Sequence, residues 1–240
     1  MAIEIKNLTK KYKDVIAVNN INLTIHDGEL FSLLGVNGAG KTTLIKMLST
    51  LTNPTSGDAF INSYSIINNE DKVKEIIDIS MQETAIARKL TVKENLYFYG
   101  KLNGLSKEEL NKTIDNLAKT FNLYPIFNKM SCKLSGGYQR KLSIALALIS
   151  KPKVLFLDEP TLGLDVLARR ELWETIKSLK GKMTIILTTH YMEEAQELSD
   201  RIGIIKEGNM LFVGSKEKLY QLTNKTNVED AFVNLVKGGD

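Results

Sequence analysis

The sequence predicts an α/β fold whose mostly parallel sheet is covered by helices on both faces. Residues 30–34, 154–157 and 183–188 are short apolar runs with the length and composition of buried strands. Two segments that follow such strands, residues 41–51 and 168–179, have apolar side chains at helical spacing. Strands that alternate with helices are typical of a parallel sheet with helices on both sides.

Length and composition fit one large domain. The chain has 240 residues, of which 43% are hydrophobic and 25% are charged, as in an ordinary globular protein. This length predicts one domain, with room for an inserted lobe. The single cysteine, Cys132, excludes an internal disulfide framework and fits a reducing compartment. The net charge of +4 comes from basic and acidic residues that are mixed along the chain, so we expect no nucleic-acid partner.

No segment of the sequence predicts a membrane span. The longest apolar stretches, such as residues 142–149, fall far short of the roughly 18–20 residues that cross a bilayer. Residues 1–6 lack the long apolar core of a signal peptide. We therefore expect a cytosolic chain, in which any role at a membrane depends on a separate partner.

The first sixty residues predict three further strands and a helix. Apolar residues alternate at positions 2–9 and 15–25, and another short strand is predicted at 59–61. Between these strands a helix is expected to begin at Lys41. Its predicted apolar face consists of four side chains: Leu44, Met47, Leu48 and Leu51.

Residues 91–150 predict a mainly helical insertion, because lysine, glutamate and leucine dominate and Pro125 is the only proline. Strand–helix alternation then returns, and a helix is predicted at 191–198 and a strand at 202–205. We expect a single domain with three parts: a core (1–82 and 152–218), a helical lobe (83–151) and short C-terminal helices (219–240).

A glycine-rich loop between a predicted strand and a predicted helix fits the pattern G-x-x-x-x-G-K-[ST]. Its residues are Gly35, Val36, Asn37, Gly38, Ala39, Gly40, Lys41 and Thr42. The glycines let backbone N–H groups surround phosphate oxygens, and the start of the helix adds further unpaired N–H groups. Lys41 offers a positive charge to the terminal phosphates, and the Thr42 hydroxyl can bind Mg²⁺. The loop therefore predicts a nucleotide site.

Three polar residues follow predicted strands at the edge where ligands bind in such sheets. Asp158 and Glu159 follow one strand, and His190 follows another. Because adjacent strand residues face opposite ways, we expect Asp158 to hold Mg²⁺ through water and Glu159 to accept a proton from the attacking water. His190 is predicted to contact a terminal phosphate. The alternatives are a solvated loop for the two acids and a capping or surface role for the histidine.

A second glycine pair lies at residues 134–139, Leu-Ser-Gly-Gly-Tyr-Gln, before a predicted amphipathic helix. Ser135 can cap this helix, while Gly136 and Gly137 expose its first N–H groups to an anion. Considered alone, the segment is better explained as a plain helix cap.

Taken in order, these motifs resemble the nucleotide-binding domain of ATP-binding-cassette (ABC) transporters over essentially the whole chain. In that family, residues 35–43, which include Thr43, look like the Walker A loop and residues 154–159 like the Walker B strand. Residues 134–139 look like the family signature, and His190 looks like the switch histidine.

Three assignments come from the resemblance alone. It implies that Gln82 reaches Mg²⁺ and the attacking water, that Tyr12 stacks on adenine, and that Asp165 belongs to the D-loop. The sequence departs from the family at Val36 and Val166, where proline is common. Neither position contributes a side chain to phosphate binding.

The resemblance also implies an architecture and an activity. The fold would be a P-loop NTPase core with an N-terminal antiparallel β-subdomain and an inserted helical subdomain. Two ATPase subunits, identical or paralogous, would bind two ATP molecules head to tail with Mg²⁺, each between the Walker A loop of one chain and the signature of the other. Hydrolysis would drive transport through separate transmembrane permease subunits, which places the chain at the cytoplasmic face of the membrane.

Within the family, residues 162–170 and 188–195 resemble the branch that exports drugs, antibiotics, bacteriocins, sodium or polysaccharide. One alternative is a regulatory cassette that signals through a membrane partner without moving cargo. Another is a non-transport ABC ATPase acting on DNA or ribosomes. Such ATPases usually carry coiled-coil insertions, zinc motifs or a second cassette, which this sequence lacks.

Overall fold

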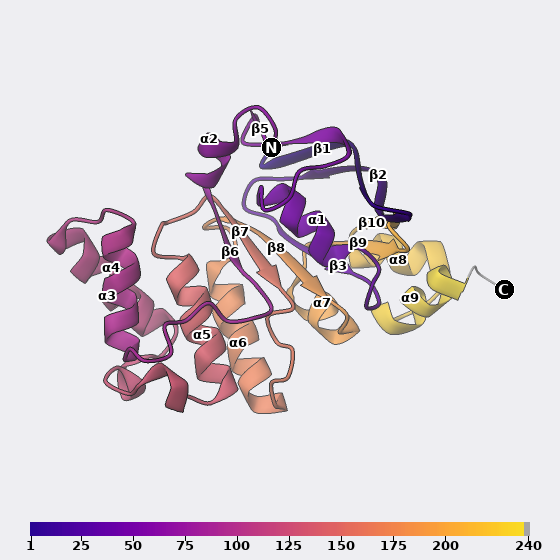
Figure 1. Ribbon diagram of the computed structural model, residues 1–240. Coiled ribbons are helices and arrows are strands. Elements are labelled where there is room, and N and C mark those ends of the chain that lie inside the picture. Colours follow the sequence, from indigo (N-terminus) through magenta and orange to yellow (C-terminus); the bar gives the residue numbers. More distant parts are fainter. Residues whose placement is uncertain (238–240) are drawn as a thin grey trace.

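The larger of two sheets forms the centre of the computed structural model, which describes residues 1–237 (Figure 1). It contains six strands: β3 (Leu30–Leu34), β6 (Ile77–Ser80), β7 (Val154–Asp158), β8 (Thr184–Thr189), β9 (Arg201–Lys206) and β10 (Asn209–Gly214). Their order is β10-β9-β3-β8-β7-β6. All neighbours pair in parallel except β9 and β10, so the predicted mostly parallel sheet is confirmed.

The smaller sheet is antiparallel, as the resemblance implied. It contains β1 (Ile3–Tyr12), β2 (Val15–Ile25), β4 (Ser56–Ile61) and β5 (Tyr64–Ser65), in the order β2-β1-β4-β5. Helix α1 (Lys41–Leu48) lies between the two sheets (Figure 1). Leu44 of α1 shares one apolar core with Ile5 of β1 and Phe156 of β7, so both sheets fix the position of the helix.

Helix α1 is shorter than the sequence predicts. Thr50 has a left-handed backbone conformation with φ of 59°, which a helix cannot continue through. Leu51 therefore lies beyond the helix with 58% of its surface exposed. The prediction that Leu51 belongs to the apolar face is wrong.

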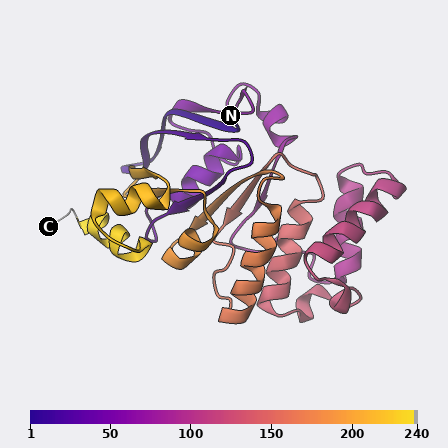
Figure 2. The same cartoon turned by 180° about the vertical axis from the view of Figure 1, so that it is seen from behind.

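The opposite face of the larger sheet is covered by α5 (Gly136–Ala147) and α6 (Val166–Leu179), which Figure 2 shows from behind. Alternation along β7 produces the two faces: Leu155 and Leu157 pack in the core on the α5 side, and Val154 packs with Phe156 in the core on the α1 side.

The predicted helical insertion is present between β6 and β7. It contains α3 (Val92–Leu102), α4 (Lys107–Thr120) and α5, with short 3₁₀ turns at Tyr124–Ile126 and Ser131–Lys133. Thr91 and Ser106 begin α3 and α4 with capping boxes, which satisfy N–H groups that the helices leave free.

Four elements were not predicted from the sequence: α2 (Glu70–Lys74), β5, β6 and β10. In β6 the acidic Asp78 interrupts the apolar pattern; it accepts a hydrogen bond from Ser150 Oγ at 3.0 Å. Helix α7 (Met192–Leu198) packs against β3 and β8. Helices α8 (Lys216–Thr223) and α9 (Val228–Lys237) share an apolar core with α7, β9 and β10. The last residues of the predicted C-terminal helices, 238–240, lie outside the described residues. Within residues 1–237, no helix has both the length and the hydrophobicity that crossing a bilayer requires.

Candidate active site

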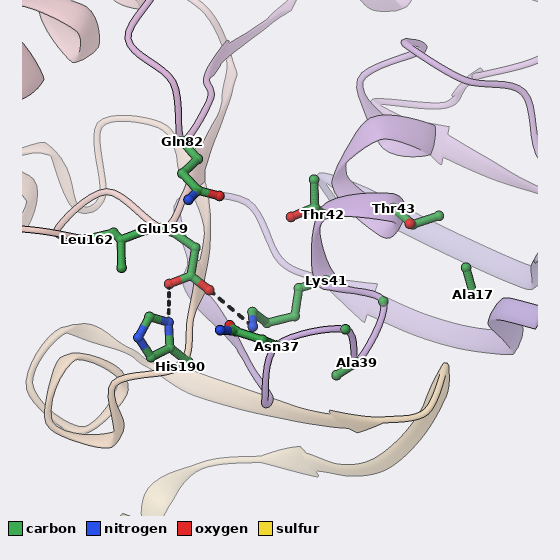
Figure 3. Close-up of a pocket in the computed structure, with 12 residues that line it drawn as sticks. Ala17, Asn37, Ala39, Lys41, Thr42, Thr43, Gln82, Glu159, Leu162 and His190 are labelled. Atoms are coloured by element: carbon green, nitrogen blue, oxygen red, sulfur yellow. Dashed lines mark hydrogen bonds and ion pairs between the residues drawn. The ribbon is translucent and has the colours of Figure 1, made fainter.

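A cavity of about 350 Å³ lies at the carboxyl edge of the larger sheet, over the loop that joins β3 to α1. Its lining residues come from five segments of the chain (Figure 3): Ala17, Asn37, Gly38, Ala39, Gly40, Lys41, Thr42, Thr43, Gln82, Glu159, Leu162 and His190. Two loop positions require glycine. Gly40 has φ of 107°, and a Cβ there would lie 2.2 Å from the Ala17 carbonyl oxygen. A Cβ on Gly35 would lie 2.6 Å from the Ile205 carbonyl oxygen.

Lys41 is the buried cation of this cavity, with 5% of its surface exposed. Its Nζ donates to the carbonyl oxygens of Gly35 at 2.7 Å and Val36 at 3.2 Å. It also forms an ion pair with Oε1 of Glu159 at 3.1 Å. These contacts hold the ammonium group at the mouth of the loop, where backbone N–H groups and a helix N-terminus already favour an anion.

Asp158 is the last residue of β7, and its two carboxylate oxygens differ in their hydrogen bonding. Its Oδ1 accepts from Thr42 Oγ1 at 3.2 Å and from Thr188 Oγ1 at 2.5 Å. Its Oδ2 is buried and has no hydrogen-bond partner among the described residues. Gln82 lines a neighbouring hollow together with Thr42 and Asp158. Carboxylate, hydroxyl and amide oxygens are hard ligands, so this donor set fits a divalent cation such as Mg²⁺.

The carboxylate of Glu159 contacts other side chains than the carboxylate of Asp158 does, although both residues bond to Thr188. It has φ of 49°, and its N–H donates to Thr188 Oγ1 at 3.1 Å. Its Oε2 lies 2.6 Å from Nδ1 of His190. This contact is a hydrogen bond to the carboxylate in the histidine tautomer that carries its proton on Nδ1. Figure 3 shows Glu159 bridging His190 and Lys41, which fixes the direction of its carboxylate.

Two further buried ionisable groups, on α5 and α7, have shifted pKa values. Burial raises the pKa of Glu194 on α7, although Trp173 Nε1 donates to its Oε1 at 3.0 Å. Burial lowers the pKa of Arg140 on α5, while the negative charges of Asp158 and Glu194 oppose this change.

Besides Gly35 and Asp158, five of the predicted site residues lie outside the cavity lining. Tyr12 lies at the end of β1, 46% exposed, with Lys10 Nζ at 5.0 Å from its ring centroid. Ser135, which begins α5, accepts from the Tyr138 N–H at 3.5 Å, and Gly136 and Gly137 follow it. Asp165 begins α6 and accepts from two backbone N–H groups, at 3.0 and 2.9 Å.

We call Ser135, Gly136, Gly137 and Asp165 the signature surface. Its two halves are close together, since a Cβ on Gly137 would lie 3.0 Å from the Cβ of Ala168 in α6. The remaining site residues line the cavity, or in the cases of Gly35 and Asp158 bond directly to residues that do. The sequence analysis missed Ala17 and Leu162 as lining residues. Apolar side chains of this kind carry no chemical signal that would have identified them.

Comparison with known proteins identifies the family. A family model described as ABC transporter matches residues 18–162, more than half of the chain. The chain belongs to the ABC transporter family. A second model, described as "AAA domain, putative AbiEii toxin, Type IV TA system", matches residues 132–194.

Relatives of this cassette include much longer proteins. Phospholipid-transporting ATPase ABCA3 of Homo sapiens is 42% identical over 223 residues, which are 91% of this chain and 13% of that protein. ABC transporter A family member 8 of Arabidopsis thaliana is 39% identical over 243 residues, 95% of this chain and 27% of that protein. The cassette thus spans a small part of these relatives. They belong to the A family and do not specify the drug-exporter branch.

Solved structures share the whole fold of the cassette. The ATP-binding subunit of an ABC transporter superposes with a TM-score of 0.87 at 26% identity, covering 98% of this chain and 100% of that one. A dimeric ATP-binding cassette in a post-hydrolysis state, bound to ADP and Pi, has a TM-score of 0.79 at 28% identity, covering 89% and 98%. The chain is therefore an ABC ATPase domain.

Proposed function

We propose that the cassette binds ATP with Mg²⁺ in the cavity over residues 35–43 and hydrolyses it as a head-to-tail dimer. The observation that supports this best is the arrangement of Glu159, whose carboxylate is held between Lys41 and His190, while the preceding residue, Asp158, has a carboxylate oxygen without a hydrogen bond among the described residues. A base, a cation for phosphate and a ligand for a divalent ion thus meet in one small volume.

The residues of the cavity would have separate roles in binding and hydrolysing ATP. Lys41 and the loop N–H groups bind the phosphates, and Thr42, Asp158 and Gln82 hold Mg²⁺, which would neutralise charge on the phosphate oxygens. Glu159 accepts the proton of the attacking water, and His190 keeps its carboxylate oriented by the 2.6 Å contact. Half-exposed Tyr12 offers its ring to the adenine.

The signature surface supports the dimer. Ser135 and Gly136 are exposed and line no part of their own chain's cavity, yet they begin a helix whose N-terminus favours an anion. We infer that they, with Gly137 and Asp165, bind the ATP held by a second copy or a paralogue. A solved relative of this fold is dimeric.

The proposal also includes a role in transport. Hydrolysis would drive movement of cargo, by export, through separate membrane subunits, so that the cassette acts at the cytoplasmic face of a membrane. One solved relative, cbiO1 from Clostridium perfringens, is described as part of an ABC transporter complex; it superposes with a TM-score of 0.84 at 29% identity, covering 92% of this chain and 90% of that one.

The dependence of specific ATPase activity on protein concentration tests the shared site. We expect turnover per chain to rise as dimers form, because a monomer lacks the second copy's Ser135. A flat dependence in a sample that remains monomeric would contradict the shared site. ATP-dependent flux through a co-purified membrane partner tests the transport role, which ATP hydrolysis without flux would contradict.

A further inference from the structure

Arg140 of α5 holds the main chain of the segment that carries Gln82. Its Nη1 donates to the carbonyl oxygen of Met81 and its Nη2 to that of Gln82, both at 2.6 Å. The side chain is buried, with 5% of the residue exposed. The planar guanidinium group thus binds two consecutive carbonyl groups, a geometry that suits its fork of donors.

A second contact, one turn further along α5, joins this helix to the same segment. The Oγ atoms of Ser143 and Ser80 lie 3.1 Å apart, and both residues are buried. Ser80 ends β6 and pairs with Leu157 of β7, next to Asp158. The three consecutive residues 80–82 are therefore attached to one helix at the edge of the sheet where Asp158 lies.

The hydrogen bonds of Arg140 go to main chain rather than to a carboxylate. Asp158 and Glu194 act on it through their negative charges, which oppose the effect of burial on its pKa. A buried cation that binds two carbonyl oxygens restrains the backbone there, and residues 81–91 form no helix or strand of their own.

We propose that Arg140 is a positioning residue for Gln82, holding its backbone so that its side chain stays at the cavity beside Asp158 and Thr42. In Figure 3 the amide of Gln82 extends toward Glu159 and Thr42. Ser135 begins the helix that carries Arg140, so residues 135–137 of the signature surface and the backbone of Gln82 are attached to the same helix. The inference rests on the proposed ATPase function.

A double-mutant cycle on turnover tests this role. Arg140→Lys keeps the charge but replaces the planar fork of two donor nitrogens by one nitrogen on a shorter side chain, so the two carbonyls would be held less firmly. We therefore expect kcat to fall about tenfold, because small displacements of a catalytic group reduce rate strongly. KM for ATP should change less than about threefold, since the phosphate loop is untouched. In a Gln82→Ala background, Arg140→Lys should lower kcat no further. Independent, multiplicative effects would overturn the proposal.

The neighbouring residue Lys141 provides a matched control. It is also a buried cation on α5, but it pairs with Glu171 of α6 at 2.8 Å, and no hydrogen bond or ion pair within residues 1–237 joins its side chain to residues 80–82. Lys141→Met should lower thermal stability at least as much as Arg140→Lys, yet leave kcat within about twofold of wild type. Equal losses of kcat in both variants would overturn the positioning role. Wild-type turnover and its loss in Glu159→Gln test the proposed function separately.

Discussion

The cavity over the phosphate loop and the signature surface differ in how far one chain completes them. In the cavity, Lys41 contacts Glu159 and Glu159 contacts His190, at 3.1 and 2.6 Å. On the signature surface, Ser135 and Asp165 use their side-chain oxygens to cap their own helices. The side chains of the cavity are paired within one chain, whereas in the proposed dimer the signature surface would be half of a site. In the proposed dimer, the start of α1 would bind phosphate within its own chain, and the start of α5 would complete the site of the partner chain.

The largest expected effect is that of Glu159→Gln on the chemical step. Glutamine keeps the shape but is a far weaker base, so kcat should fall by roughly 10²–10⁴-fold. Removing a negative charge beside the phosphates should preserve or strengthen nucleotide binding. The variant should therefore accumulate as an ATP-bound dimer, measured by size-exclusion chromatography with ATP and Mg²⁺. Wild-type turnover would show that Glu159 is not the base, and a monomer at saturating ATP would contradict the dimer.

Lys41→Ala should weaken ATP binding by about 10- to 150-fold, because hydrogen bonds to charged groups contribute roughly 1.5–3 kcal/mol. Equilibrium binding of ATP measures this effect. The control is Lys74→Ala on α2, which removes only a surface ion pair with Glu70 and should leave affinity unchanged. Near-normal affinity and ATPase activity in Lys41→Ala would contradict the assignment of the cavity.

Ser135→Ala tests whether Ser135 contributes to the ATP site of a second copy or only caps α5. Ser106→Ala is the matched control. Both serines cap helices of the helical lobe, so each change should lower stability by about 1 kcal/mol. Only Ser135→Ala should lower turnover at high protein concentration, by about tenfold for one lost hydrogen bond to a phosphate. Equal turnover in the two variants would mean that Ser135 is a cap and nothing more.

Tyr12→Leu should have the smallest effect, about a fivefold loss of ATP affinity, the low end for stacking of a base on an aromatic ring. Its control is Tyr64→Leu, which removes another exposed tyrosine that has a lysine over its ring. A loss of ATP affinity in both variants, or in neither, would remove Tyr12 from the adenine site.

The sequence predicted the parts of the molecule in which the signal is local. The strand at Leu30–Leu34, the glycine loop and the start of α1 at Lys41 follow one another directly, and the structure has them where the sequence predicts. The rule that ligands bind at the carboxyl ends of parallel strands also predicted that Glu159 and His190 lie close together, although 31 positions separate them.

Features that depend on distant contacts were not predicted. Strand β6 contains only four residues, one of them acidic, and is defined by its pairing with β7. The contacts of Arg140 join it to backbone carbonyls 58 and 59 positions away, and every residue has such a carbonyl. Tyr12 and Gln82 were assigned only by the resemblance, because neither lies in a local pattern with its own chemistry.

Mixing two defective variants tests most directly whether the two regions belong to one shared site. Lys41→Ala and Ser135→Ala homodimers have a defect in both of their sites. In a head-to-tail mixed dimer, one site carries both defects and the other carries none. Mixing equal amounts should therefore raise ATPase activity above that of either variant, toward about a quarter of wild-type turnover. Activity of the mixture equal to the mean of the two variants would contradict the shared site.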